Sequence, residues 1–61
     1  MKFRELMKRM DFVEDVGYYT RKFTRIFEMP DGLYISHTIS KTRHKFELAD
    51  IDMWVKYFDR I

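Results

Sequence analysis

The residues of this chain that could do chemistry are mainly cations, and they gather in two short stretches. Six of its 12 Lys and Arg residues fall there. Guanidinium and ammonium groups held together attract phosphates and other anions. The alternative is that cations on exposed strands only prevent sheet edges from pairing with other chains. The candidate anion-binding residues are Arg21, Lys22 and Arg25 in the first stretch, and Lys41, Arg43 and Lys45, with His44 beside them, in the second.

The remaining chemically capable groups are the two histidines, His37 and His44. The chain has no Cys, so disulfides and thiolate zinc sites are excluded. Two histidines without thiolates make a weak case for zinc. We therefore expect no metal and no other cofactor.

A turn signal indicates how the two cationic stretches are brought together. Pro30-Asp31-Gly32 lies between two runs rich in Ile, Phe, Tyr and Thr. Pro suits the first central position of a type I turn, Asp suits the second, and Gly accepts the positive φ that follows. The pattern predicts a β-hairpin with a three-residue loop, which carries the two basic stretches to its open end.

This loop length sets a register in which Met29 lies opposite Leu33. Counting back from the loop then places Arg25 opposite His37, on a face whose other pairs are apolar. A polar pair in that position suggests an anion site in which His37 donates or accepts a proton. The alternative is an Arg whose stem lies along apolar surface, beside a partly buried His.

The same register gives the hairpin a second, more polar face. Tyr rings can stack on bases, and hydroxyl groups can reach phosphates, so this face is a candidate contact surface. Thr and Tyr also favour strands for packing reasons alone, which makes a merely solvated face the alternative. The predicted members of this face are Thr20, Lys22, Thr24, Ile26, Tyr34, Ser36 and Thr38.

Two amphipathic helices are expected to flank the sheet. Apolar residues recur at helical spacing over residues 2–10, and again after Asp50, a credible N-cap. Between them, strand composition covers 18–29 and 33–40, with short candidate strands at 12–16 and 44–48. We predict one α+β domain, residues 1–61, in which both helices cover one face of a three- or four-stranded antiparallel sheet.

Size and composition narrow the function classes. A chain of 61 residues forms a small core, which aromatic packing (18% Phe, Trp and Tyr) or self-association would support. Its apolar runs fall far short of the ~20 residues that span a bilayer, and its charged N-terminus does not resemble a signal peptide. We expect a complete, cytoplasmic protein with no membrane contact.

The predicted element order, helix, three strands, helix, is similar to the layout of double-stranded-RNA-binding domains, including the small HicA-type toxins. The resemblance covers element order and length. In those toxins a working His follows a Gly-Ser segment at the second strand. The matching stretch here, Gly17 to Lys22, has no His.

These observations favour a small non-catalytic module that binds DNA, RNA or another polyanion through the basic end of the hairpin. The alternative is a protein-interaction, regulatory or assembly module that acts as a homodimer or inhibitor. A ribonuclease that uses His37 with Arg25 is a third, weaker hypothesis, because a single His lacks a partner base.

Overall fold

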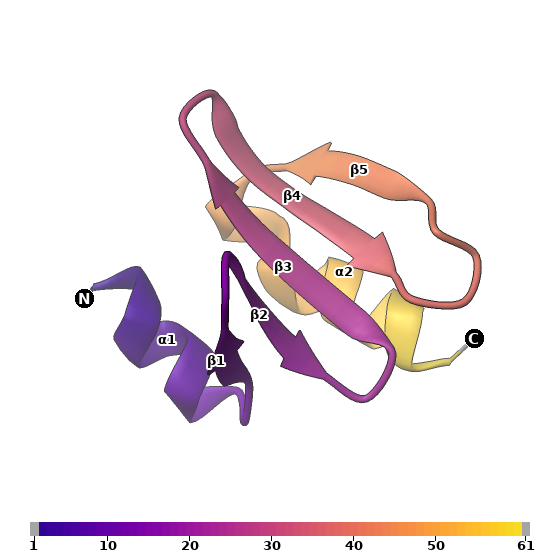
Figure 1. Ribbon diagram of the computed structural model, residues 1–61, viewed down its shortest axis with the longest axis horizontal. Coiled ribbons are helices and arrows are strands. Elements are labelled where there is room, and N and C mark those ends of the chain that lie inside the picture. Colours follow the sequence, from indigo (N-terminus) through magenta and orange to yellow (C-terminus); the bar gives the residue numbers. More distant parts are fainter. Residues whose placement is uncertain (1, 61) are drawn as a thin grey trace.

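The computed structural model describes residues 2–60 and contains a five-stranded sheet with two helices (Figure 1). A single 3₁₀ turn, Leu48–Asp50, leads into the second helix. The elements in chain order are α1 (Phe3–Arg9), β1 (Val13–Asp15), β2 (Tyr18–Arg21), β3 (Thr24–Met29), β4 (Gly32–His37), β5 (Arg43–Phe46) and α2 (Ile51–Asp59).

The sheet is an antiparallel meander in which every strand pairs with the next one along the chain. The expectation of three or four strands is therefore wrong, although the α+β class holds. The segment predicted as one strand, residues 18–29, reverses at Lys22-Phe23 and forms both β2 and β3. Lys22 takes a φ of 53° there. Because neither residue is a typical turn former, the sequence carries no signal for this reversal. With five strands, the fold also departs from the three-strand layout of double-stranded-RNA-binding domains.

The β3–β4 hairpin turns where predicted, but its register differs by one residue. Met29 pairs with Gly32, so Pro30 and Asp31 alone form the loop. Gly32 has the expected positive φ, at 143°. A shift of one residue moves one strand's side chains to opposite faces of the sheet relative to the prediction.

Burial explains why this register is preferred. It pairs Ile26 with Ile35, and both side chains are 0% exposed. It also pairs Thr24 with His37, which are each 1% exposed. The predicted register would have placed Ile26 on the face away from the core. It would have buried Phe27 in its place, but it would also have turned Arg25 into the core, and the cost of burying a guanidinium without a paired anion favours the observed pairing.

The two helices occupy different places, so the prediction that both cover one sheet face was imprecise. α2 lies behind the sheet, with Val55 and Phe58 buried against it (Figure 1). α1 lies beside the β1–β2 end (Figure 1), where Met7 is buried and the Phe3 ring meets Tyr19 edge-on at 5.6 Å. No helix within residues 2–60 is both long and apolar enough to cross a bilayer.

α2 begins directly after the 3₁₀ turn. Asp50 occupies its N-cap position, as expected, but its side chain makes no capping hydrogen bond. Asp52 lies in the first turn, where the helix dipole favours a carboxylate. The start of α2 therefore depends more on burial of Ile51 than on a side-chain cap.

Candidate functional site

The candidate site is the face of the sheet that points away from α2, here called the outer face. Within the described residues, no helix lies in front of β3 and β4 on this side (Figure 1). Strand pairing arranges its residues in two rows that cross the strands. The aromatic row consists of Tyr18, Phe27 and Tyr34 and ends at Lys45. The cationic row consists of Thr20, Arg25, Ser36 and Arg43.

Two of the three rings in the aromatic row are in contact. The centres of the Tyr18 and Phe27 rings are 5.5 Å apart, and the rings are tilted by 47°. Phe27 lies directly opposite Tyr34 in the next strand, and all three side chains are half-buried. The row therefore places partly exposed aromatic rings on a sheet face that no helix within residues 2–60 covers.

The cationic row lies close enough to cover these rings. The guanidinium carbon of Arg25 is 4.9 Å from the centre of the Tyr18 ring, and that of Arg43 is 4.4 Å from the centre of Phe27. Cation–π attraction holds guanidinium groups at such distances. Both arginines are thereby kept on the outer face instead of extending freely into solvent.

Arg25 and Arg43 also border a shallow depression of about 440 Å³. Lys41 reaches it from the β4–β5 loop, and Ser36 supplies a hydroxyl group, whereas the Thr38 hydroxyl donates to the Phe23 carbonyl at 3.0 Å. None of the residues that line it carries a carboxylate. Three cations and the Ser36 hydroxyl around one hollow provide the charge and hydrogen-bond donors that a phosphate group needs.

Charge varies from one edge of the outer face to the other. Arg43 and Lys45 lie on β5, at one edge of the sheet. Asp15 lies on β1 at the other edge, and Glu14 beside it is paired with Arg4 at 2.9 Å. The positive potential is therefore concentrated toward β4 and β5.

Three of the predicted site residues, Arg21, Lys22 and His37, lie away from this face. Arg21 is turned inward, where its guanidinium donates to the Met10 carbonyl and pairs with Asp59. Lys22 is exposed in the β2–β3 turn. The structure thus brings together Arg25, Lys41 and Arg43, with Lys45 next to Arg43 on the same strand face, and leaves Arg21 and Lys22 outside the group.

The predicted Arg25–His37 pair does not form. Arg25 pairs with Ser36 on the outer face, whereas the His37 ring is buried and meets Phe58 edge-on at 5.8 Å. His37 borders the depression, but its Nδ1 accepts hydrogen bonds from the Ile39 and Ser40 amides at 3.3 and 3.4 Å. The register shift explains this error, because it moves Arg25 to the face opposite His37.

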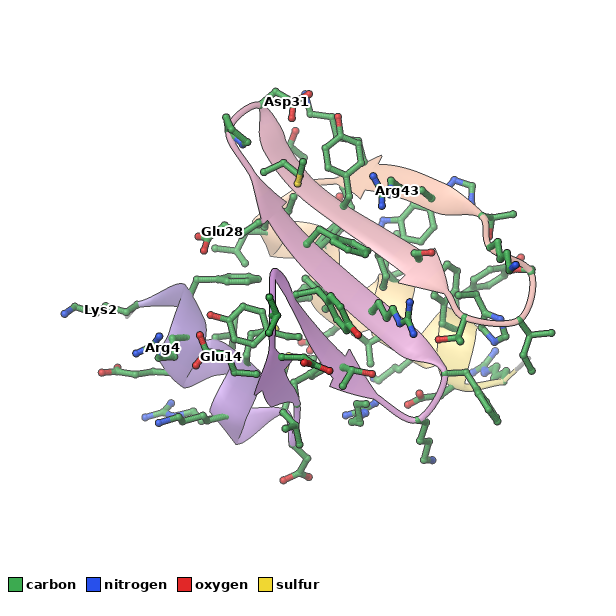
Figure 2. All side chains as sticks on the ribbon, viewed as in Figure 1. Lys2, Arg4, Glu14, Glu28, Asp31 and Arg43 are labelled. Atoms are coloured by element: carbon green, nitrogen blue, oxygen red, sulfur yellow. The ribbon has the colours of Figure 1, made fainter. Side chains whose placement is uncertain are left out.

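Tyr34 is held in place by the hairpin tip. Its hydroxyl donates to Asp31 at 2.6 Å. This hydrogen bond lowers the pKa of the Asp31 carboxyl, and it raises the pKa of the Tyr34 hydroxyl. Figure 2 shows Asp31 at the tip of the hairpin, with Arg43 farther along the sheet. The bond limits rotation of the Tyr34 ring on the outer face.

Sequence reasoning missed the contributions of Tyr18 and Phe27. The register that follows from a three-residue loop places Phe27 opposite Ile35 on the core side, because that loop is one residue longer than the observed one. Ile26 and Phe27 are adjacent apolar residues, so alternation within β3 does not say which of them is buried. A two-residue loop at Pro30-Asp31 would have identified the outer face correctly.

A second surface feature lies on α2. Met53 and Tyr57 are each 59% exposed, although they are large apolar residues. With Trp54 and His44 they line an apolar cleft of about 280 Å³. The His44 ring stacks on Trp54, with ring centres 5.3 Å apart. This cleft is separate from the cationic depression and has a different chemical character.

The comparisons with known proteins identify no relative. No protein-family model, curated protein or solved structure matches this chain significantly. Within residues 2–60, no group of three or more His, Cys, Asp or Glu side chains is arranged to hold a metal ion.

Proposed function

We propose that this chain is a small nucleic-acid-binding module that engages phosphates through the outer face of its sheet. The observation that carries the proposal is the depression shared by Arg25, Lys41 and Arg43, in which no lining residue is acidic. The role assigned is positioning by charge and hydrogen bonding, with no chemical step. The proposed partner is DNA or RNA.

The arrangement suits a chain of phosphates better than a single small anion. Lys45 extends the cationic surface along β5, beyond the depression. The hollow is open and shallow, so a ligand there keeps much of its solvent contact. Affinity would come from several phosphate contacts that each release counterions, which makes binding strongly salt-dependent.

The test is fluorescence anisotropy with labelled DNA and RNA oligonucleotides over a range of salt concentrations. The variant Arg25→Gln/Lys41→Asn/Arg43→Gln removes three cations from the depression. Asn is chosen at Lys41 because its φ is 58°, a conformation that Asn tolerates. The slope of log affinity against log salt should become shallower by about 2 for a single strand, or nearly 3 for a duplex.

A matched control removes the same charge elsewhere. Lys8, Arg9 and Lys56 are exposed on the two helices, so the variant Lys8→Gln/Arg9→Gln/Lys56→Gln has the same net charge as the test variant. Its salt slope should stay close to that of the natural chain. If the salt slope became equally shallow in both variants, binding would depend only on net charge and the proposed site would be wrong. The absence of binding to any oligonucleotide at low salt would also overturn the proposal.

A second candidate function, self-association through α2, is favoured by the exposed apolar residues Met53 and Tyr57. Antiparallel packing of two α2 helices would cover these side chains in both copies. It would also place Asp52, near the start of one helix, beside Lys56, near the end of the other. A second copy of this chain is therefore the partner that this surface fits, and regulation or assembly would be the role.

Sedimentation equilibrium over a wide concentration range tests self-association. The natural chain should show a rising average mass, and Met53→Lys should remain monomeric, because a charge on the apolar stripe opposes burial. A constant monomer mass for the natural chain at high concentration would exclude this candidate. The outer face would be unaffected by either result.

A further inference from the structure

We infer that the ligand of the outer face is a single-stranded nucleic acid, whose bases stack on the aromatic row while its phosphates follow the cationic row. This inference rests on the proposed function and specifies its substrate class. The two rows are adjacent and parallel, and each runs across β2, β3 and β4. They place flat apolar surface and positive charge side by side.

The spacing of the rows follows from sheet geometry. Neighbouring strands are ~4.8 Å apart, so successive residues of a row recur at about that distance. The observed 5.5 Å between the Tyr18 and Phe27 rings agrees with this spacing. The two rows are two residues apart along each strand, which is ~6.6 Å. A strand of nucleic acid laid across the sheet would keep its backbone over one row and its bases over the other.

A duplex does not suit this surface. In a double helix the base faces are stacked on one another and are closed to protein side chains, so aromatic stacking requires unpaired bases. The described part of the chain also presents no helix beside the depression that could enter a major groove, because α2 lies on the opposite side of the sheet (Figure 1). Stacking on Phe27 and Tyr34 therefore selects single strands.

The arginines determine how the rings become available. In the structure the Arg43 guanidinium covers Phe27, and that of Arg25 covers Tyr18. An incoming base takes the ring face, and the displaced guanidinium moves to the adjacent phosphate. The same two arginines thus shield the rings in the free protein and neutralise the backbone in the complex. This exchange needs only rotation of the two arginine side chains. A displaced guanidinium can also stack on a neighbouring base.

The test compares one sequence as a single strand and as a duplex, with heparin as a polyanion that has no bases. Phe27→Leu removes the central ring and keeps an apolar residue of strand-compatible size. We expect it to weaken single-strand binding roughly 5- to 150-fold, the usual range for loss of one stacked base. Heparin binding should change little. Phe23→Leu makes the same change at a ring that is 52% exposed in the β2–β3 turn and belongs to neither row, so it is the matched control and should leave all three affinities unchanged.

A second variant, Phe27→Trp, keeps a stacking ring and adds a fluorescence signal. Single strands should quench this signal, measured as the difference from the natural chain, which retains Trp54. If circular dichroism shows that Phe27→Leu is unfolded, the fluorescence of Phe27→Trp still tests whether bases stack at position 27. Quenching by single strands but not by heparin would support stacking.

The failures of the two proposals are distinguishable. If the natural chain binds duplex as tightly as single strand, and Phe27→Leu alters neither, stacking is wrong and phosphate binding stands. Unquenched Phe27→Trp fluorescence in the bound complex would lead to the same conclusion. If no nucleic acid binds at low salt, both proposals fall together.

Discussion

The Arg21 guanidinium joins the ends of both helices to the sheet. Its Nη2 pairs with the Asp59 carboxylate at the end of α2, and its Nη1 donates to the Met10 carbonyl at the end of α1, at 2.7 Å. The same group lies 5.1 Å from the centre of the Phe12 ring. A carboxylate near a helix C-terminus is unfavourable by itself, so this pairing offsets the repulsion between Asp59 and the α2 dipole.

We predict that Arg21→Met lowers the free energy of unfolding by about 1–3 kcal/mol. The substitution keeps apolar contact with Phe12 but leaves the Met10 carbonyl and Asp59 without their donor. Urea denaturation followed by circular dichroism measures the change. Lys22→Met, in the adjacent exposed turn, is the control and should change stability by less than about 0.5 kcal/mol. Similar midpoints for the two variants would contradict a structural role for Arg21.

The observed hairpin register predicts different losses of stability for alanine substitutions at two neighbouring residues of β3. Ile26 is 0% exposed, whereas Phe27 lies half-buried on the outer face. Ile26→Ala should therefore cost about 2–5 kcal/mol, enough to unfold much of a domain of this size. Phe27→Ala should cost about 1 kcal/mol. Thermal melts of the two variants provide the comparison, and a larger loss for Phe27→Ala would favour the shifted register with Phe27 in the core.

Much of the fold was predictable because helices and glycine turns leave local signals. The spacing of Phe3, Leu6, Met7 and Met10 correctly predicted α1, and the Pro30 to Gly32 signal correctly located the central hairpin. The turn at Lys22-Phe23 was not predictable in the same way. The Arg21–Thr24 pair leaves only Lys22 and Phe23 to connect β2 with β3, and Lys22 takes the positive φ of such a turn although Lys is not a residue that favours it.

The candidate site was predictable only in part, because it depends on which side chains share a face. The cationic character of residues 41–45 was evident, and Arg25 is among the candidates that the structure groups. The inward rotation of Arg21 was not evident, since its partners Met10 and Asp59 are distant in sequence. An error of one residue in the loop was sufficient to exchange Arg25 and Ile26 between faces.

The hydrogen bond between Tyr34 and Asp31 predicts a measurable pH dependence. It lowers the pKa of Asp31 in the folded chain. The ionised carboxylate therefore stabilises the fold above its unfolded-state pKa, and this contribution is lost as the pH falls through the lower, folded-state pKa. Tyr34→Phe should return the pKa of Asp31 toward its ordinary value, measured by NMR titration of the carboxyl carbon. An unchanged titration would show that the bond is absent in solution.

The variant Asp31→Asn tests the effect of the same hydrogen bond on Tyr34. The bond raises the pKa of the Tyr34 hydroxyl. Asp31→Asn keeps a residue that suits the turn but removes the negative charge, so the pKa of Tyr34 should fall toward its ordinary value. Ultraviolet difference titration of tyrosinate formation measures this shift. Tyr57→Phe, on α2, simplifies the titration and should leave the pKa of Tyr34 unchanged.

The buried His37 side chain links the core to the loop that borders the outer face. Its buried Nδ1 accepts the amides of Ile39 and Ser40, in the loop that carries Lys41 to the depression. His37→Leu preserves apolar packing against Phe58 but removes the acceptor, so both amides should exchange hydrogen about 2- to 10-fold faster. His37→Asn offers a side-chain oxygen as a replacement acceptor and should restore part of the protection.

Because the loop positions Lys41, we expect His37→Leu to weaken nucleic-acid binding as well, and His37→Asn to weaken it less. Equal exchange rates in the natural chain and His37→Leu would show that the ring is only a packing residue, and the loop would then owe its order to the Lys41 amide, which donates to the His37 carbonyl at 2.7 Å.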